Sequence, residues 1–276
     1  MIIVRLKGGL GNQMFQYALG RVLALKNGTK LLLDVEDLKN KANVLYGGFP
    51  ARTFCLDVFN IEAKVMHGGL SIWRHLFLKN IIESGFEFNP KTLAVGPEAY
   101  LDGWWQSPKY FAGYENIIKK DFSLKKEPAP NIKELAEEIE RGNSVCLHAR
   151  RTDYVGNKYH EVIGPEYYQN ALSIIRERGE IDKIYVFSDD INWCRQNMSF
   201  EYPTVFVGEE YRGEKDEGHL YLMRKCKYFA IANSSFSWWG AWLSEREGKI
   251  VVCPKQWFGD PSLETIHRIP KDWIRI

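Results

Sequence analysis

The stretch Ser144-Val-Cys-Leu-His-Ala-Arg-Arg-Thr-Asp-Tyr154 joins an apolar segment to a run of charged side chains. The apolar part, residues 144–149, predicts a buried β-strand. Because side chains alternate along a strand, we expect His148 and Arg150 on one face and Arg151 on the other. A guanidinium stays charged at any working pH and binds phosphate oxygens through two parallel hydrogen bonds. The motif therefore predicts either an anion-binding strand end or a surface cluster of ion pairs.

Strand and helix patterns alternate on both sides of this motif. On its C-terminal side the patterns predict, in chain order, a helix over 165–178, strands over 183–188 and 203–207, a helix over 219–225, a strand over 227–232, a helix over 236–246 and a strand over 249–253. At the start of the chain a strand (2–6), a glycine-rich loop (7–13), a helix (14–26) and a strand (30–33) form a βαβ unit, which implies a parallel sheet. The segment 125–131 is charged and holds two prolines, as linkers do. We therefore expect two α/β domains, 1–127 and 128–276.

Composition excludes several classes of protein. The chain has 276 residues, of which 45% are hydrophobic and 26% charged, as in globular proteins. A net charge of +2 gives no broad basic field for nucleic acid. No apolar run is long enough to span a membrane, and the start lacks the pattern of a signal peptide. Five scattered cysteines without a C-x-x-C pair favour reduced thiols and a cytoplasmic location. The amphipathic, basic segment 71–82 predicts a surface helix, and peripheral membrane contact is the alternative.

The loop Gly8-Gly-Leu-Gly-Asn-Gln13 resembles a dinucleotide-binding loop, and Asp34 stands where an acid would bind a ribose. Met14, however, occupies the position at which the third glycine of that motif is required, so the pattern only weakly supports a nicotinamide cofactor. Polar groups at a helix N-terminus suit hydroxyls or phosphates. The candidate ligand-binding residues of this loop are Gly11, Asn12 and Gln13. The alternative is a glycine turn with a polar cap.

Two further polar clusters follow predicted strands, where parallel sheets bind ligands. Ser188, Asp189 and Asp190 suit either Mg²⁺ or the donor groups of a ribose or base, and helix capping is the alternative. The serine-rich turn 233–237 suits a phosphate, although a single serine there would be a plain cap. Its candidate residues are Asn233, Ser234, Ser235, Phe236 and Ser237. The tryptophans that follow are expected in the core. The sequence holds no G-x-S-x-G elbow, no H-E-x-x-H motif and no P-loop.

Five segments in order resemble family 11 of the glycosyltransferases, the bacterial α-1,2-fucosyltransferases. They are GGLGNQMFQYA (8–18), GWWQSPKYF (103–111), HARRTDY (148–154), FSDD (187–190) and IANSSFSWWGAWL (231–243). The resemblance implies a GT-B architecture, in which two Rossmann-like domains face each other across a cleft. Domain 1–127 would bind the acceptor and domain 128–276 the donor, GDP-β-L-fucose. The product would carry α-linked fucose on O2 of a terminal β-galactoside, either free or lipid-linked, with no obligatory metal and no other cofactor.

The resemblance also implies roles for the residues of the strand motif. Forming an α-linked product from a β-linked donor inverts the anomeric carbon once, so a single displacement suffices. Arg150 would stabilise charge on the departing β-phosphate, and His148 would contact the guanine or ribose. Arg151 is expected to form a structural ion pair. Asp153 is the candidate general base, with His160 and Glu161 as alternatives.

The resemblance leaves two contacts open. Family members usually carry an acid where this chain has His219, so Asp216 or Glu217 would have to replace its contact with guanine. Trp104, Trp105 and Gln106 are expected to select the acceptor. A nicotinamide-dependent oxidoreductase and a non-catalytic glycan-binding module remain the competing classes.

Overall fold

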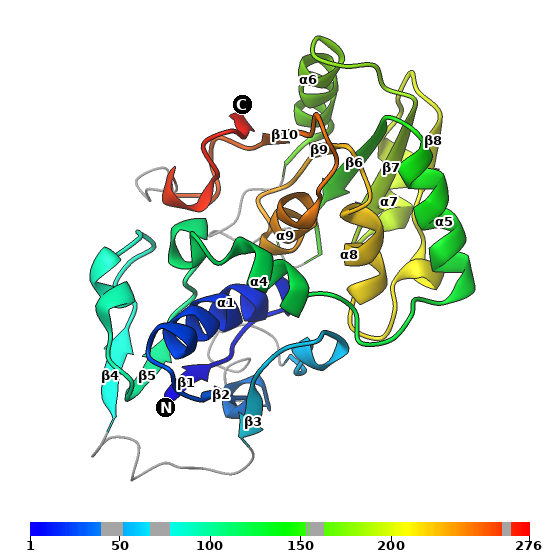
Figure 1. The fold of residues 1–276 in the computed structure, drawn as a ribbon. Helices are drawn as coiled ribbons and strands as arrows, with labels where there is room; N and C mark the ends of the chain where they lie inside the picture. The colour runs from blue at the N-terminus through cyan, green and yellow to red at the C-terminus, as the bar shows by residue number, and fades with distance from the viewer. Residues whose placement is uncertain (40–51, 67–77, 153, 155–162, 261–265) are drawn as a thin grey trace. The chain divides into compact units, whose positions relative to one another are not determined.

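The computed structural model describes residues 1–39, 52–66, 78–152, 154, 163–260 and 266–276 (Figure 1). The chain divides into two compact units, Met1–Lys126 with Glu264–Ile269, and Glu127–Leu263 with Pro270–Ile276. The sequence predicted a single crossing, between residues 127 and 128, but a segment near the C-terminal end returns to the first unit. The hydroxyl of Ser107 donates a hydrogen bond of 2.5 Å to the main-chain oxygen of His267 in this returning segment. Such a single contact, distant in sequence, leaves no pattern in the chain.

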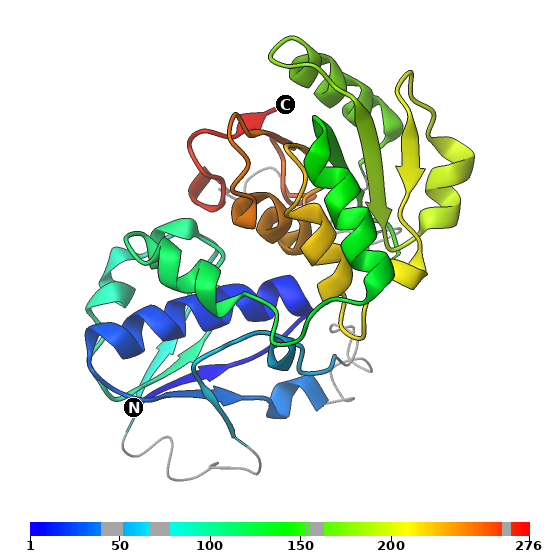
Figure 2. The ribbon, with the colours of Figure 1, turned by 45° about the vertical axis from the view of Figure 1, so that its right-hand side comes forward.

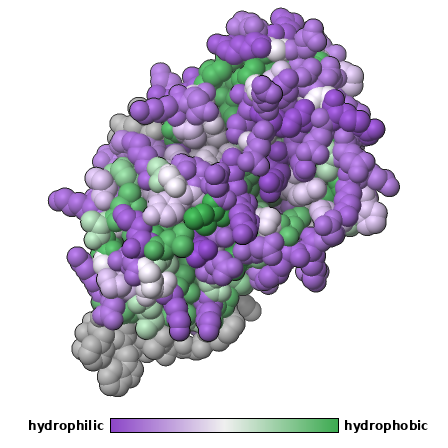
Figure 3. Space-filling view, viewed as in Figure 1, coloured by the Kyte–Doolittle hydropathy of each residue, from purple (hydrophilic) through white to green (hydrophobic). Residues whose placement is uncertain are grey.

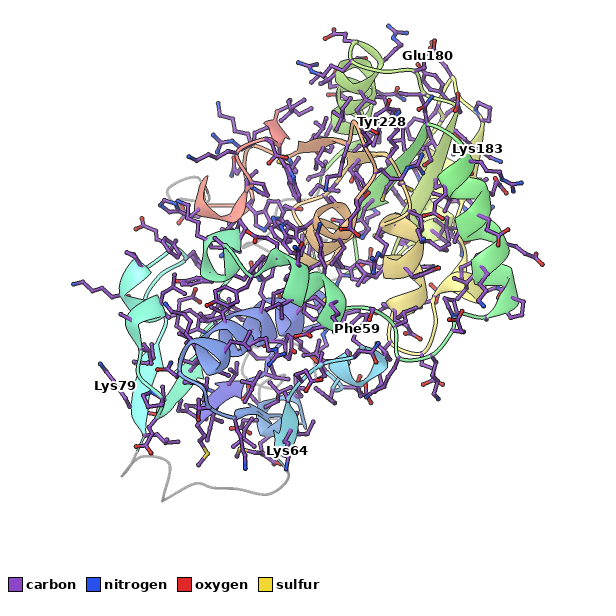
Figure 4. All side chains as sticks on the ribbon, viewed as in Figure 1. Phe59, Lys64, Lys79, Glu180, Lys183 and Tyr228 are labelled. Atoms are coloured by element: carbon purple, nitrogen blue, oxygen red, sulfur yellow. The ribbon has the colours of Figure 1, made fainter. Side chains whose placement is uncertain are left out.

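Unit 1 contains a five-stranded sheet in the order β3-β2-β1-β5-β4, in which every pairing is parallel (Figure 1). Its strands are β1 (Ile2–Arg5), β2 (Leu31–Asp34), β3 (Lys64–Met66), β4 (Lys79–Ile82) and β5 (Ala99–Asp102). Its helices are α1 (Leu10–Lys26) and α4 (Glu115–Asp121), with short 3₁₀ turns η1 (Glu36–Lys39), η2 (Leu56–Val58), η3 (Pro90–Ala94), η4 (Pro108–Phe111) and η6 (Ile266–Arg268). Lys64 and Lys79, labelled in Figure 4, mark the starts of the two outer strands.

Helix α1 packs closely on this sheet, and a glycine makes the approach possible. A Cβ atom at Gly20 would lie 2.4 Å from Cγ2 of Val4 and 2.8 Å from Cδ1 of Leu31, which is too close for any side chain. In Figures 1 and 2 the helix runs along one face of the strands. The helix begins at Leu10 rather than near Met14, because Gly9 is its extended N-cap residue. The expected glycine loop therefore ends at Gly9, and Gly11, Asn12 and Gln13 lie in the first turns of α1.

Unit 2 contains a six-stranded parallel sheet in the order β11-β10-β9-β6-β7-β8. Its strands are β6 (Ser144–Ala149), β7 (Lys183–Ser188), β8 (Thr204–Phe206), β9 (Tyr228–Ala230), β10 (Ile250–Cys253) and β11 (Ile274–Arg275). Its helices are α5 (Pro130–Arg141), α6 (Pro165–Arg176), α7 (Ile191–Asn197), α8 (Glu217–Met223) and α9 (Ser235–Leu243), with the 3₁₀ turn η5 (Glu209–Tyr211). All six residues of β6 are buried, as expected for a central parallel strand with helices on both faces.

The tryptophans of α9 pack in the core of unit 2. Trp238 and Trp239 are almost completely buried, and the ring of Trp238 lies 5.5 Å from that of Trp273. The face of the protein in Figure 3 is mostly hydrophilic, with scattered hydrophobic side chains. Within the described ranges, none of the helices combines the length and the apolar character that crossing a membrane requires.

Candidate active site

Three neighbouring strands of unit 2 place polar residues along one edge of the sheet. β6 pairs with β7 on one side, with Ala149 opposite Ser188, and with β9 on the other, with Leu147 opposite Ala230. Because the strands are parallel, their carboxyl ends meet at the same edge, which is where open α/β sheets bind ligands. Lys183 and Tyr228, labelled in Figure 4, mark the opposite, amino-terminal ends of β7 and β9.

The carboxylate of Asp189, directly after β7, holds the turn that follows β6. Its Oδ1 accepts a hydrogen bond of 2.8 Å from the main-chain N–H of Arg151. Its Oδ2 accepts one of 3.0 Å from the main-chain N–H of Thr152 and another from the hydroxyl of the same residue. Burial raises the pKa of Asp189, but the charge of Arg150 and these hydrogen bonds outweigh it, so the pKa is lowered overall. Asp189 is therefore a carboxylate anion in the folded protein at neutral pH.

Arg150, directly after β6, contacts Asp189 after β7 and Tyr154 of its own turn. Its Nε is 3.4 Å from Oδ2 of Asp189, and its guanidinium carbon is 5.7 Å from the ring centre of Tyr154. The hydroxyl of Tyr154 donates a hydrogen bond of 3.0 Å to the main-chain oxygen of Asn233, which follows β9. The side chain of Arg150 is 22% exposed, so a ligand in solution can reach it. The result is a permanent cation held at the sheet edge.

His148, the penultimate residue of β6, is buried and uncharged. Burial is the main cause that lowers its pKa to about 3, and the charges of Arg150 and His219 act in the same direction against the opposing charge of Asp189. Its ring lies 6.0 Å from that of Phe236. Its Nδ1 has no hydrogen-bond partner within the described part of the chain. A buried polar atom of this kind usually has a partner, so a ligand group is a natural candidate.

The serine turn after β9 uses most of its polar groups within the protein. Ser234 is the N-cap of α9 and accepts a hydrogen bond of 3.3 Å from the N–H of Phe236. The buried hydroxyl of Ser237 donates a hydrogen bond of 3.3 Å to the main-chain oxygen of Ser234. The side-chain amide of Asn233 donates a hydrogen bond of 3.0 Å to the main-chain oxygen of Trp257. Ser235, at the first position of α9, is only partly buried and is the serine of this turn best placed to meet a ligand.

Ser188 and Asp190 shape the turn after β7. The hydroxyl of Ser188 accepts a hydrogen bond of 2.9 Å from the N–H of Asp190. Asp190 is the N-cap of α7, and its carboxylate accepts 3.1 Å from the N–H of Trp193. Capping, the alternative that the sequence left open, therefore applies to Asp190. Among the described residues, no group of three or more His, Cys, Asp or Glu side chains is arranged to hold a metal ion.

Arg151, expected in an ion pair, instead stacks on an aromatic ring. Its guanidinium carbon lies 3.3 Å from the ring centre of Trp193, which belongs to α7. This contact and that of Asp189 both connect the turn after β6 to the segment after β7. Asp153, His160 and Glu161, the candidate general bases, lie outside the described residues.

His219 and its acidic neighbours are engaged in contacts of their own. His219 is buried beside Phe187, and its Nε2 donates a hydrogen bond of 2.9 Å to the oxygen of Gly208. Burial lowers its pKa. Asp216 forms an ion pair with Arg212. The carboxylate of Glu217 accepts hydrogen bonds from two main-chain N–H groups of its own loop. These contacts favour a structural role for both acids over the proposed contact with guanine.

In unit 1, the glutamine of the first loop motif is fully buried and acts within the fold. Gln13 donates hydrogen bonds of 3.0 and 2.9 Å to the oxygens of Gly8 and Thr53, and accepts one of 2.9 Å from the N–H of Cys55. Both ends of the Gln13 amide are therefore engaged within the fold, and its burial keeps it from the phosphate or hydroxyl that the sequence suggested. Gly11 is buried as well, whereas Asn12 is partly exposed. Of the three predicted residues, Asn12 is thus the candidate for ligand contact.

The features that suggested a dinucleotide cofactor also serve the fold. Asp34 is 2% exposed and accepts a hydrogen bond of 2.8 Å from the hydroxyl of Tyr100, so it is not presented to a ribose. Met14 is completely buried. The close approach of helix and strand, for which the dinucleotide motif uses its third glycine, is provided here by Gly20. The structure therefore argues against the nicotinamide alternative.

The aromatic segment after β5 is organised by Glu83. Its carboxylate accepts hydrogen bonds of 2.6 and 3.1 Å from the N–H groups of Trp104 and Trp105. Trp105 is buried and has a φ of 55°, a left-handed conformation that only a few non-glycine residues adopt. Trp104 is partly exposed, with Nζ of Lys7 4.8 Å from its ring centre. Nε2 of Gln106 donates a hydrogen bond of 2.6 Å to Oδ1 of Asn12, and Oε1 of Gln106 accepts one from the guanidinium of Arg268. Trp104 and Asn12 thus remain candidates for a sugar site, while Trp105 belongs to the core and the amide of Gln106 is engaged within the fold.

Comparison with known proteins gives the family. The family described as glycosyl transferase family 11 matches residues 1–276. The chain belongs to glycosyltransferase family 11. It is 32% identical over 299 residues to an α-1,2-colitosyltransferase of Escherichia coli, covering 100% of this chain and 99% of that protein. It is 33% identical over 290 residues to the O-antigen biosynthesis glycosyltransferase WbnK of the same species, covering 92% and 93%.

A solved structure supports the architecture of this glycosyltransferase. The fucosyltransferase NodZ from Bradyrhizobium superposes with a TM-score of 0.52 and 13% identity, over 87% of this chain and 90% of that one. At that identity the likeness concerns the fold alone. The predicted GT-B fold class, with two parallel-sheet α/β units, is confirmed.

Several residues that shape the two strand-end regions carry no clear signal in the sequence. Thr152 and Tyr154 lie within the strand motif, but their contacts with Asp189 and Asn233 are not visible in the sequence, and neither is the contact of Trp193 with Arg151. The fully buried side chain of Gln16 binds the main chain of Lys7. It accepts a hydrogen bond of 3.0 Å from the N–H of Lys7 and donates one of 3.2 Å to its carbonyl oxygen. The signal that was available is the density of polar residues directly after predicted strands.

Proposed function

We propose that this family 11 glycosyltransferase transfers L-fucose from GDP-β-L-fucose to O2 of a terminal β-galactoside, with inversion at the anomeric carbon. One observation carries the proposal. Arg150 stands at the carboxyl end of the central strand β6, in contact with Asp189, which follows β7, and with Tyr154, which is hydrogen-bonded to the segment after β9. A permanent cation at this edge suits the diphosphate of a nucleotide sugar.

Arg150 acts on the leaving group in this scheme. As the bond between fucose and the β-phosphate breaks, negative charge builds on the phosphate oxygens. A guanidinium presents donors in a fork that matches phosphate oxygens. A preorganised donor of this kind stabilises a transition state by about 3–4 kcal/mol. Because the cation is already in place before the reaction, no reorganisation is needed at the moment of transfer.

His148 and the serine turn complete the proposed donor site. The neutral imidazole of His148 places Nδ1 in a buried position without a partner among the described residues, where it suits a hydrogen bond to the ribose or the guanine. The N-terminus of α9 begins at Ser235, and the positive end of a helix favours a phosphate. We assign the diphosphate to Arg150 and Ser235, and the nucleoside to His148.

Unit 1 supplies the proposed acceptor site at the carboxyl edge of its own sheet. Trp104 offers a partly exposed aromatic face, and the partly exposed side chain of Asn12 offers a hydrogen bond to a sugar hydroxyl. Deprotonation of the acceptor hydroxyl is assigned to Asp153, with His160 and Glu161 as alternatives. We propose that the reaction needs no metal, takes place in the cytoplasm and uses a free or lipid-linked oligosaccharide.

The E. coli relative favours a second candidate, transfer of colitose. Colitose is L-fucose without its 3-hydroxyl, so GDP-fucose and GDP-colitose would present the same configuration at the anomeric carbon to the donor site. Mass spectrometry of reactions containing GDP-fucose or GDP-colitose with a panel of β-galactosides separates the candidates, and linkage analysis of the product gives the bond. Transfer of fucose to O2 in the α configuration is the expected result. Transfer of colitose alone selects the second candidate, and transfer of neither sugar overturns the proposal.

A further inference from the structure

Asp189 and Asp190 are adjacent acids at the same strand end, but the structure gives them different partners. The carboxylate of Asp190 accepts a hydrogen bond from the N–H of Trp193, and Asp190 is the N-cap of α7. Asp189 reaches across to the neighbouring strand end, where it accepts the N–H of Arg151, the N–H of Thr152 and the Thr152 hydroxyl, and pairs with Arg150. Both carboxylates looked equally suited to a metal or a ribose in the sequence.

The partners of Asp189 use the acceptor capacity of its carboxylate. An ionised carboxylate has about four lone-pair sites. Three hydrogen bonds and one ion pair, all from residues 150–152, already address its two oxygens. A sugar hydroxyl or a metal ion would have to displace one of these contacts. The side chain is 16% exposed, which further limits access by a ligand.

The contacts of Asp189 hold two parts of the neighbouring turn, namely the main chain after Arg150 and the guanidinium of Arg150 itself. Its hydrogen bonds to residues 151 and 152 set the direction in which the main chain leaves β6. Its ion pair with Arg150 is made to Nε, at 3.4 Å, and favours one orientation of the guanidinium. A displacement of about 1 Å in a group that stabilises a transition state can reduce a rate by about 10²-fold.

We infer that Asp189 is a positioning residue that acts on the reaction through Arg150, and that it binds neither the donor nucleotide nor a metal. The inference rests on the proposed function, because it assigns Arg150 to the departing diphosphate. It assigns the second acid of the strand end, Asp190, to the helix alone.

A double-mutant cycle tests this assignment. We expect Asp189→Asn to lower kcat about 10- to 100-fold while the KM for GDP-fucose changes less than about threefold. In an Arg150→Gln background, the same substitution should change kcat less than about threefold, because the group it positions is gone. If Asp189→Asn lowers kcat by the same factor with Arg150 and with Gln at position 150, the inference is overturned. A loss confined to the affinity for GDP-fucose would also overturn it.

Asp190→Asn is the matched control. It removes the same charge one residue away, and asparagine caps a helix about as well as aspartate. Its effect on kcat should be the same with Arg150 or with Gln at position 150. A cycle in which Asp190→Asn shows the same dependence on Arg150 as Asp189→Asn would mean that charge alone, and not the contacts of Asp189, is responsible, and the inference would be wrong.

A second variant covers failure of Asp189→Asn to fold, which its melting temperature reveals. Thr152→Val removes the hydroxyl donor to Asp189 and keeps the carboxylate. It should lower kcat about 3- to 10-fold, again only when Arg150 is present; an equal loss in both backgrounds overturns the inference. A wild-type enzyme that binds no GDP-fucose in calorimetry and transfers no sugar refutes the proposed function itself, whereas an active wild type with additive mutants refutes only the role of Asp189.

Discussion

The buried imidazole of His148 predicts a specific sensitivity of the fold to acid. Burial, with the charges of Arg150 and His219, lowers the pKa of His148 to about 3 against the opposing charge of Asp189. In the unfolded chain the same imidazole has its ordinary pKa of 6.5. The folded protein therefore keeps His148 neutral at pH values at which the unfolded chain binds a proton.

The difference in proton binding sets the direction and the size of the effect. Above pH 6.5 neither state binds the proton, and the contribution of His148 to stability is fully present. As the pH falls from 6.5 towards 3, the unfolded state gains a proton that the folded state excludes, so stability is lost. With 1.36 kcal/mol per pH unit of difference, lowering the pH from 7 to 5 costs about 2 kcal/mol through this residue.

Urea unfolding measured at both pH values, at constant ionic strength, checks the prediction. The comparison is between the wild type and His148→Gln, which replaces the imidazole with an amide that does not titrate. The wild type should lose about 2 kcal/mol more than the variant between pH 7 and pH 5. His219 and the carboxyl groups titrate in both proteins, so their contributions largely cancel. An equal loss in the two proteins would refute the neutral, buried state of His148.

Three other expectations are tested by single experiments. Gly20→Ala should lower the free energy of unfolding by about 1–3 kcal/mol, because its Cβ would meet Val4 and Leu31, whereas Gly96→Ala, with open space around the new atom, should cost less than about 0.5 kcal/mol; equal melting temperatures would contradict the close packing of α1. Ser235→Ala should raise the KM for GDP-fucose in steady-state kinetics more than Ser237→Ala does, because Ser235 is partly exposed whereas Ser237 is completely buried, and equal KM values would contradict the assignment. Addition of EDTA should leave kcat within about twofold of its initial value if Arg150 supports the leaving group without a metal, and loss of activity restored by Mg²⁺ would reverse that assignment.

The sequence predicted five of the six strands of unit 2 well because their apolar runs are continuous, whereas the two-residue strand β11 was missed. The predicted bounds 144–149 and 183–188 are those of β6 and β7 in the structure. The sheet edge on which the candidate site lies follows directly from parallel strands that end in polar residues. The start of α1 was placed too late because the sequence Gly8–Gln13 suggests a loop, while only Gly8, with a φ of 78°, and Gly9 lie outside the helix.

The roles of individual polar side chains were much harder to predict. Gln13 and Asp34 look like ligand-binding groups in the sequence because they are polar and follow a glycine loop and a strand. In the folded chain their partners are the main chain at residues 53 and 55 and the hydroxyl of Tyr100. Such contacts between distant residues leave no local pattern.

The two acids after β7 show the same limit. Asp189 and Asp190 are chemically identical neighbours, and only their orientation separates the residue that holds Arg150 from the residue that begins α7. The expected partner of Arg151 was a charged group, but in the structure it is the ring of Trp193. A sequence pattern predicts that a polar group needs a partner, and the fold decides which partner it has.

Replacement of Arg150 tests the central claim most directly, namely that a fixed guanidinium at the end of β6 stabilises the departing diphosphate. The measurement is kcat for transfer from GDP-fucose to the best acceptor, in the wild type and in Arg150→Gln, with the melting temperature confirming that the variant is folded. The account predicts a loss of about 10²- to 10³-fold, equivalent to about 3–4 kcal/mol of transition-state stabilisation. A folded variant that transfers fucose at the wild-type rate would contradict it.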